Sequence, residues 1–271
     1  MRTKKIIAVL MLLSVWTPGR LLAQSDVKEQ LVVPLSDPGK PVKIVAHVLN
    51  STLRVIGYEG KEVTINVTAE AGHRRENAGG MKRIGGGAGG EVTADENHNT
   101  VNISSGLSHF SVIEIRVPAT SVSLDIGTVN EGKIEVENVT GQLEVSNVNG
   151  PITCTNVGGS VVANTVNGSV VVTLKSIDPQ APMAFSTLNG NIDVTFPAAI
   201  KANVKLKAEH NDIFSDFDVE ITKTNPTVKK STEGHMSKIT IDDWVYGKIS
   251  GGGPEIMMNT TFGSIYIRKA K

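Results

Sequence analysis

The sequence of 271 residues has little of several things that proteins commonly rely on. It contains one cysteine, Cys154, which excludes an intrachain disulfide. Aromatic residues make up only 4% of the chain. Basic and acidic residues number 27 each, so no excess of positive charge points to nucleic acid or to anionic lipid. No apolar run reaches the roughly 20 residues of a membrane-spanning helix.

The first 23 residues have the organisation of an export signal. Basic residues stand among the first five, Ile6 to Trp16 is mostly apolar, and Leu21-Leu22-Ala23 offers a cleavage site. Removing this segment takes four basic residues and no acidic ones, which leaves a net charge of about −4. Gln24 follows the site, where a lipoprotein would need cysteine. We therefore predict a protein exported to the periplasm or cell surface of a Gram-negative bacterium.

Glycine recurs every nine residues through the middle of the chain. The regular positions are Gly132, Gly141, Gly150, Gly159 and Gly168. Each opens a similar phrase, such as GKIEV or GSVVV, and the phrase returns at Gly190 and Gly263. A short fixed period of this kind is typical of a solenoid in which each repeat is one strand and one turn. The sequence therefore predicts an all-β, single-domain β-solenoid, or β-helix, over residues 24–271, most regular over 129–194.

The second and fourth residues after each glycine are apolar, and the residues between them are mostly polar. This alternation is typical of strands with one buried face. The first members of these pairs, predicted to form one buried column, are Ile134, Leu143, Ile152, Val161, Val170 and Ile192. The second members, predicted to lie alongside, are Val136, Val145, Cys154, Ala163, Val172 and Val194. Cys154 is thus predicted to be a small core residue rather than a nucleophile or metal ligand.

Turn residues are placed with the same regularity. Glycine at the start of each unit suggests a corner with a positive φ. Asn138, Asn147 and Asn156 stand three residues before successive glycines, where they are expected to stack in a ladder at one corner. Glycine every nine residues also argues against helix after the signal segment. Residues 71–99 contain eight glycines and little to bury, so we expect a mobile loop there.

Three stretches together resemble a bacterial family of β-strand-repeat proteins known as putative adhesins. They are the pair of strand-like segments at 50–65, the row of N-G-x-I/V-x-V units between 129 and 194, and the ending at 251–267. The resemblance covers nearly all of the chain after the signal segment. It implies a β-helix-like fold in the cell envelope, and no catalytic residues come with it. Two features depart from the family pattern: Asp212, where a glycine-containing turn is usual, and the 71–99 insertion.

Candidate chemistry in the sequence is sparse. Glu135, Glu144 and Asp193 occupy equivalent positions, and stacked repeats would make the first two neighbours, as paired acids of a glycosidase require. All three are nevertheless expected on the outer face of regular strands, where solvated charge is usual. None of the six histidines forms a pair at metal-ligand spacing. We predict no catalytic, metal or cofactor site.

Aromatic residues gather near the C-terminus. Trp244 and Tyr246 stand beside Asp242 and Asp243, and aromatic rings next to acids can bind sugars. The competing interpretation is that these rings close the open end of the solenoid, whose core is otherwise exposed. The four residues are the only ligand-binding candidates that we select from the sequence.

The sequence favours an exported, non-enzymatic adhesion or cell-envelope interaction module. Its partner would be an envelope or extracellular glycan or protein, bound by multivalent weak contacts. One alternative is a polysaccharide-active β-helix enzyme, a lyase or a glycosidase, which requires a groove with clustered acids or basic residues on one face of the solenoid. Another is a periplasmic envelope-stress scaffold or sensor, which requires a protein ligand at an exposed edge. The sequence does not decide the oligomeric state or the number of strands per coil.

Overall fold

The computed structural model describes residues 27–69, 91–106, 111–119, 121–130, 132–222, 227–233, 236–242 and 244–271. The predicted signal segment, 1–23, and most of the predicted loop, 70–90, lie outside these ranges. The described chain is all-β, without a helix, so it holds no helix able to span a membrane. The strands are β1 Val27–Val33, β2 Val42–Leu49, β3 Ser51–Tyr58, β4 Val63–Ala69, β5 Val92–Asn97, β6 Thr100–Ser105, β7 Ser111–Pro118, β8 Ser121–Val129, β9 Ile134–Glu137, β10 Thr140–Asn147, β11 Ile152–Asn167, β12 Val170–Ile177, β13 Met183–Asn189, β14 Ile192–Phe196, β15 Ala202–Ala208, β16 Ile213–Ser215, β17 Val219–Thr222, β18 Thr227–Glu233, β19 Met236–Asp242, β20 Val245–Ile249, β21 Glu255–Phe262 and β22 Ile265–Lys269.

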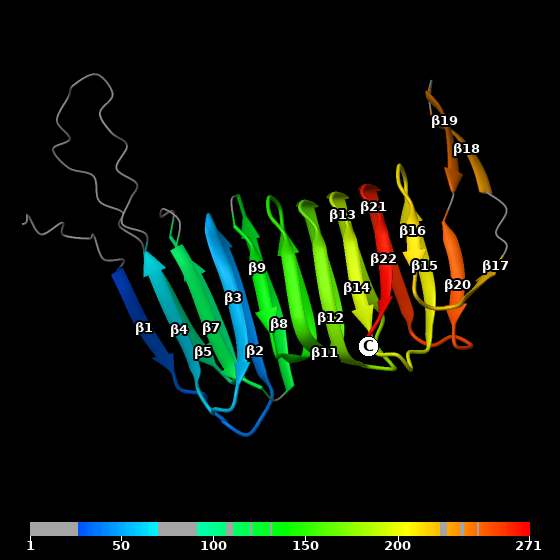
Figure 1. Cartoon of the computed structure of the whole chain (residues 1–271). Helices are drawn as coiled ribbons and strands as arrows, with labels where there is room; N and C mark the ends of the chain where they lie inside the picture. Colours follow the sequence, from blue (N-terminus) through cyan, green and yellow to red (C-terminus); the bar gives the residue numbers. More distant parts are fainter. Residues whose placement is uncertain are drawn as a thin grey trace, which may run out of the picture.

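Twenty of the strands form one sheet that folds into two facing layers, a nearly closed, barrel-like shell around the core (Figure 1). Layer A runs β5-β6-β2-β8-β10-β11-β13-β21-β15-β20-β17. Layer B runs β1-β4-β7-β3-β9-β11-β12-β14-β22-β16. The long strand β11 belongs to both layers, its first half to B and its second half to A. Strands β18 and β19 form a separate pair beyond β17 and β20.

The chain alternates between the layers, and neighbouring strands in the regular region are parallel. Ile134 pairs with Ile152 in layer B, and Leu143 pairs with Val161 in layer A. In each of these two pairs the partners are 18 residues apart in the sequence, not nine. One circuit of the chain around the core therefore contains two nine-residue units, one in each layer. Strand β13 follows a longer connection, so Val170 pairs with Ile192, 22 residues on.

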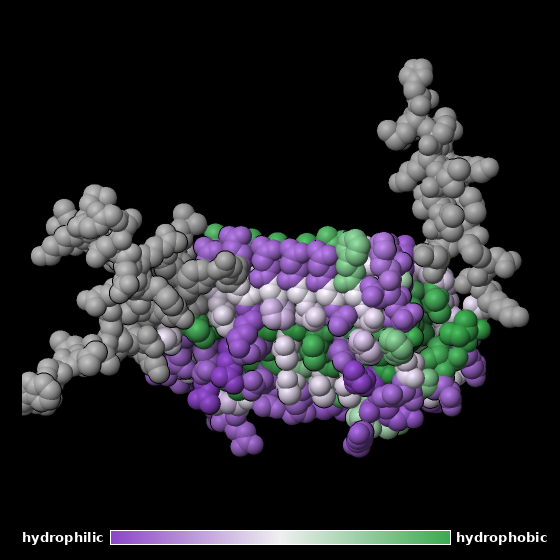
Figure 2. Space-filling view, turned by 45° about the horizontal axis from the view of Figure 1, so that its top comes forward, coloured by the Kyte–Doolittle hydropathy of each residue, from purple (hydrophilic) through white to green (hydrophobic). Residues whose placement is uncertain are grey.

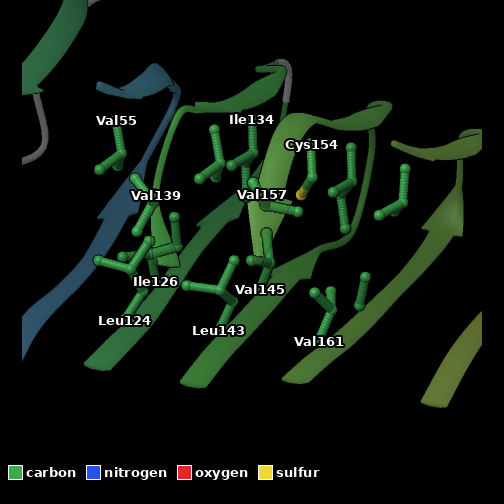
Figure 3. Packing of buried hydrophobic residues seen from close by; sticks show 14 of the residues in the cluster. Val55, Leu124, Ile126, Ile134, Val139, Leu143, Val145, Cys154, Val157 and Val161 are labelled. Atoms are coloured by element: carbon green, nitrogen blue, oxygen red, sulfur yellow. The ribbon is translucent and has the colours of Figure 1, made fainter. Parts of the chain in front are cut away.

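The predicted inward residues are all buried, but they form two sets of columns rather than one. The residues Ile134, Ile152, Val170 and Ile192 stack in layer B, and Leu143 and Val161 stack opposite them in layer A. Side chains of the two sets point toward one another across the core (Figure 3). Cys154 lies in the layer B set and is 1% exposed. Burial raises the pKa of its thiol to about 12, which suits a core residue.

Glycine is required at the corners mainly because successive circuits approach too closely for a side chain. A Cβ on Gly150 would overlap the carbonyl oxygen of Gly132, and a Cβ on Gly168 would overlap that of Gly150. The predicted positive φ occurs at Gly141 and Gly159, with φ of 148° and 97°. Gly132, Gly150 and Gly168 do not adopt it. The prediction was therefore right at the corner of Gly141 and Gly159. At the other corner it was right at Gly190, with φ of 157°, and wrong at Gly132, Gly150 and Gly168.

The asparagine ladder also divides between two places, because its members are nine residues apart. Asn156 Nδ2 donates to Asn138 Oδ1 at 2.6 Å, so these two stack at one corner as predicted. Asn147 lies in the opposite layer, buried, and donates to the Gly132 carbonyl at 2.9 Å. Thr165 takes the equivalent position one circuit on and donates to the Gly150 carbonyl at 3.0 Å. Buried polar groups thus tie each circuit to the one before it.

The order of circuits in space differs from their order in sequence at both ends. The circuit β2/β3 lies between β6/β7 and β8/β9. The final circuit, β21/β22, lies between β13/β14 and β15/β16. Strand β5, at 92–97, pairs antiparallel with β6, so the end of the predicted loop is strand instead. Its polar alternation, ADEN, gave little sign of this.

Candidate functional site

The carboxylates considered from the sequence do not form a pair. Glu144 lies on the exposed outer face of layer A, whereas Glu135 lies on that of layer B. Glu135 contacts Lys133 at 2.6 Å. Asp193 lies in the same row of layer B as Glu135, but strands β11 and β12 stand between them. Its carboxylate forms an ion pair with Arg268. The nine-residue spacing suggested neighbours only because it did not reveal two layers.

Trp244 and Tyr246 lie near the end of layer A. Trp244 stands just before the antiparallel strand β20, and Tyr246 lies on that strand. Both side chains are half-buried. Rings that only closed the end of the core would be buried, and rings that formed a flat sugar-binding surface would be exposed, so their burial fits neither interpretation fully. Lys205 Nζ lies 4.7 Å from the centre of the Trp244 ring. Asp242 ends β19 and its side chain is outside the description, as is the whole of Asp243. The structure therefore brings together two of the four predicted residues.

An open groove of about 370 Å³ adjoins this region. It is lined by Asn203, Val204, Lys205, Thr222, Tyr246, Gly247, Lys248 and Glu255. Gly247 is one of the lining residues, and a Cβ there would meet the side chain of Val219. The groove offers a tyrosine ring together with two lysines and one glutamate.

Two aromatic pairs stand on the outside of the terminal circuits. The His210 and Phe262 rings are stacked with centroids 4.6 Å apart, and the Phe214 and Tyr266 rings with centroids 5.2 Å apart. Arg268 lies 5.1 Å from the centre of the Tyr266 ring. The presence of β21/β22 beside β15/β16 creates both pairs. Three of these rings, Phe214, Phe262 and Tyr266, belong to the gathering of aromatic residues near the C-terminus, but the sequence alone does not indicate which of them pair.

A serine, a histidine and an aspartate also come together on layer A. His47 Nε2 is 2.8 Å from Asp125 Oδ1. Ser146 Oγ and His47 Nδ1 lie 2.6 Å and 2.8 Å from the place where a Cβ on Gly127 would be, so they face the same gap. The histidine is exposed, and water competes for its hydrogen bonds. The three side chains come from the neighbouring strands β2, β8 and β10.

The described residues contain no group of three histidine, cysteine, aspartate or glutamate side chains placed to hold a metal ion. His47 lies on β2, His98 lies in the turn between β5 and β6, and His210 lies in the connection between β15 and β16. The remaining three histidines are outside the described ranges.

No family model and no curated protein matches this sequence. Among solved structures, the chain is similar to a putative cell adhesion protein from Clostridium sporogenes ATCC 15579. The two share 15% sequence identity with a TM-score of 0.41, over 91% of this chain and 100% of the other. Likeness at this level transfers no residue or role to this protein.

Proposed function

We propose that this protein is an exported, non-enzymatic β-solenoid that serves as an adhesion or cell-envelope interaction module. In this proposal each 18-residue circuit is one coil, and the coils form a stiff body whose outer rows repeat at the spacing of neighbouring strands, about 4.8 Å. Hydrophilic and hydrophobic stripes run along the long axis of the body (Figure 2). Such stripes present the same groups many times in a fixed arrangement.

The observation that carries the proposal is a double row along one corner, which we name the corner ridge. Its amide row consists of Asn149, Asn167 and Asn189, which hydrogen-bond in sequence at 2.8 Å and 2.7 Å. Its aliphatic row consists of Val129, Val148, Val166 and Leu188, on successive circuits. Val129, Val166 and Leu188 are 40%, 38% and 45% exposed. Aliphatic side chains in water at equivalent positions of successive circuits form a continuous apolar strip.

The corner ridge supports binding to a repetitive partner. Each circuit offers one amide and one aliphatic group, which is a weak contact by itself. Repetition along a rigid body makes later contacts intramolecular, and avidity can then exceed the affinity of one contact by about 10²–10⁴. The ladder also fixes the amides before binding, which reduces the entropic cost of ordering them. An adhesive surface needs no cleft and no catalytic group.

The test is co-sedimentation of the purified protein with envelope fragments of its own cells. The double variant Val166→Lys with Leu188→Lys places two charges in the aliphatic row. We expect it to bind at least about tenfold more weakly, because a two-circuit gap removes the avidity of the row. Val171→Lys is the matched control, because Val171 is 40% exposed on layer B, away from the ridge.

Equal binding by the ridge variant and the control would reject the ridge as the binding surface. Binding of wild type to no envelope fraction would reject the proposed function itself. Protease treatment of intact cells then separates two forms of the proposal: accessible protein fits adhesion, and full protection fits the alternative of a periplasmic scaffold.

A further inference from the structure

We propose that the outward-facing aromatic pairs at the C-terminal end bind a neutral or amine-bearing glycan chain. We name this surface the aromatic strip: His210, Phe214, Phe262 and Tyr266, with the ion pair of Asp193 and Arg268 at one side. The inference rests on the proposed function, since it assigns a ligand class and a second site to the same envelope-binding module.

The pairing of neighbouring strands brings the four rings of the aromatic strip together. In layer A, Ala208 pairs with Thr260, and two residues further along both chain segments His210 stacks on Phe262. In layer B, Phe214 pairs with Tyr266 and their rings lie within 12° of parallel. Both pairs join the same two circuits and are four residues apart in each chain segment. Four rings therefore follow the corner where layer A turns into layer B.

These rings do not close the core. Phe185 and Phe196 are fully buried between the layers, and Phe217 is buried beside Lys269, close to the C-terminus. Phe262 and Phe214 instead point outward, 53% and 49% exposed. Other outer positions of the same layer B row are Glu135, Thr153, Val171 and Asp193. Large rings placed where charged, polar or small aliphatic groups suffice for folding indicate a binding surface.

The groups beside the rings are those that a sugar requires. Arg268 donates three hydrogen bonds to Asp193: Nε to Oδ1 at 2.7 Å, Nε to Oδ2 at 3.0 Å and Nη2 to Oδ2 at 2.8 Å. The Arg268 guanidinium of this ion pair lies over the Tyr266 ring, and the pair is partly exposed. Its remaining hydrogen-bond donors and acceptors therefore face solvent next to the aromatic surface. Aromatic faces can pack against the C–H faces of sugar rings, while the ion pair and the Tyr266 hydroxyl hydrogen-bond to sugar hydroxyls. A few polar groups around an apolar platform give orientation and specificity.

The charge around the strip selects among glycans. The segment that carries His210 and Phe214 contains the exposed acids Glu209, Asp212, Asp216, Asp218 and Glu220. Lys207 pairs with Glu209 at 3.0 Å, and Lys269 Nζ lies 5.0 Å from the centre of the Phe217 ring. The acids exceed these cations. Like-charge repulsion therefore disfavours an acidic polysaccharide and favours a neutral or amine-bearing chain.

A second copy of the protein is a poorer occupant. A stable protein interface buries about 800 Å² on each partner, whereas an aromatic side chain buries about 150–250 Å² when fully covered. The two exposed phenylalanines are already half-covered, so they supply only a minor part of such an interface. A linear oligosaccharide needs no more than a short row of platforms.

The test is calorimetric titration of the full chain with three hexasaccharide probes: cellohexaose, fully deacetylated chitohexaose and an acidic hexauronate. We expect binding of the first two and at least about tenfold weaker binding of the hexauronate. Phe214→Ala and Phe262→Ala should each weaken binding about tenfold, and Phe214→Tyr should restore it because the ring face is kept. Val171→Ala is the matched control, in the same register row as Phe214 and without a ring. Melting temperatures of all variants should agree within a few degrees, since the rings lie outside the core.

Failure of all three probes to bind would overturn the inference, as would a preference for the hexauronate. So would ring variants that bind like Val171→Ala, or ring-dependent dimers in sedimentation without glycan binding. Envelope co-sedimentation of Phe214→Ala keeps the two proposals separate. If the glycan inference fails while wild type and Phe214→Ala both bind envelopes, the proposed function still stands.

Discussion

Replacing Gly150 by alanine is expected to destabilise the protein by about 3 kcal/mol, because the added Cβ would overlap the backbone of the preceding circuit. The neighbouring atoms are the Gly132 carbonyl group and Asn147 Nδ2. They cannot move aside without breaking the hydrogen bond that Asn147 donates to Gly132. For a chain of this size the melting temperature should fall by about 6–12 °C, at about 2–4 °C per kcal/mol.

Gly39→Ala is the control for this prediction. A Cβ on Gly39 meets only Asp37 Oδ1, at 3.9 Å, and Gly39 has no positive φ. Its replacement should leave stability unchanged or raise it slightly by restricting the unfolded chain. If Gly150→Ala melts at the same temperature as Gly39→Ala, the backbones of successive circuits do not approach each other as closely at Gly150 as described.

Replacing Leu143 by alanine is expected to cost about 2–5 kcal/mol, the usual range for removing a large apolar side chain from a core. Leu143 is 2% exposed and faces the layer B columns from layer A. Its neighbour Glu144 is exposed on the other face of the same strand. Glu144→Ala should therefore change stability by no more than about 0.5 kcal/mol. Urea unfolding of both variants, compared at the same denaturant slope, measures the difference.

Similar losses from the two variants would mean that β10 is not buried on one face. A larger loss from Glu144→Ala would reverse the assignment of inside and outside for the whole strand, because a one-residue shift exchanges the faces.

Burial within each strand could be predicted from the sequence, because alternation reports directly which residues avoid water. Ile134 and Val161 both followed from this pattern. Their division between two layers did not, because the units at Gly132 and Gly141 have the same phrase although they face each other across the core. A period of nine is compatible with one unit per circuit or two. Only the pairing of strands decides between them.

The candidate site shows the same limit. A C-terminal gathering of aromatics could be predicted, and Trp244 with Tyr246 was selected because acids stood beside them in sequence. The exposed pairs instead combine Phe214 with Tyr266 and His210 with Phe262, residues about 50 positions apart. They meet because the last circuit inserts between two earlier ones. No local pattern in the chain records that insertion.

The most direct test of the account is a pair of deletions measured by thermal unfolding, because every row on the surface depends on a circuit of two nine-residue units. Deleting residues 150–167 removes one full circuit and lets β12 take the place of the first half of β11 beside β9. The account predicts a shorter protein that unfolds cooperatively, as expected where each repeat contacts only its neighbours. Deleting residues 150–158 removes half a circuit and sends all later strands to the wrong layer, so no cooperative transition should remain. A nine-residue deletion that folds as well as the 18-residue deletion would contradict the account.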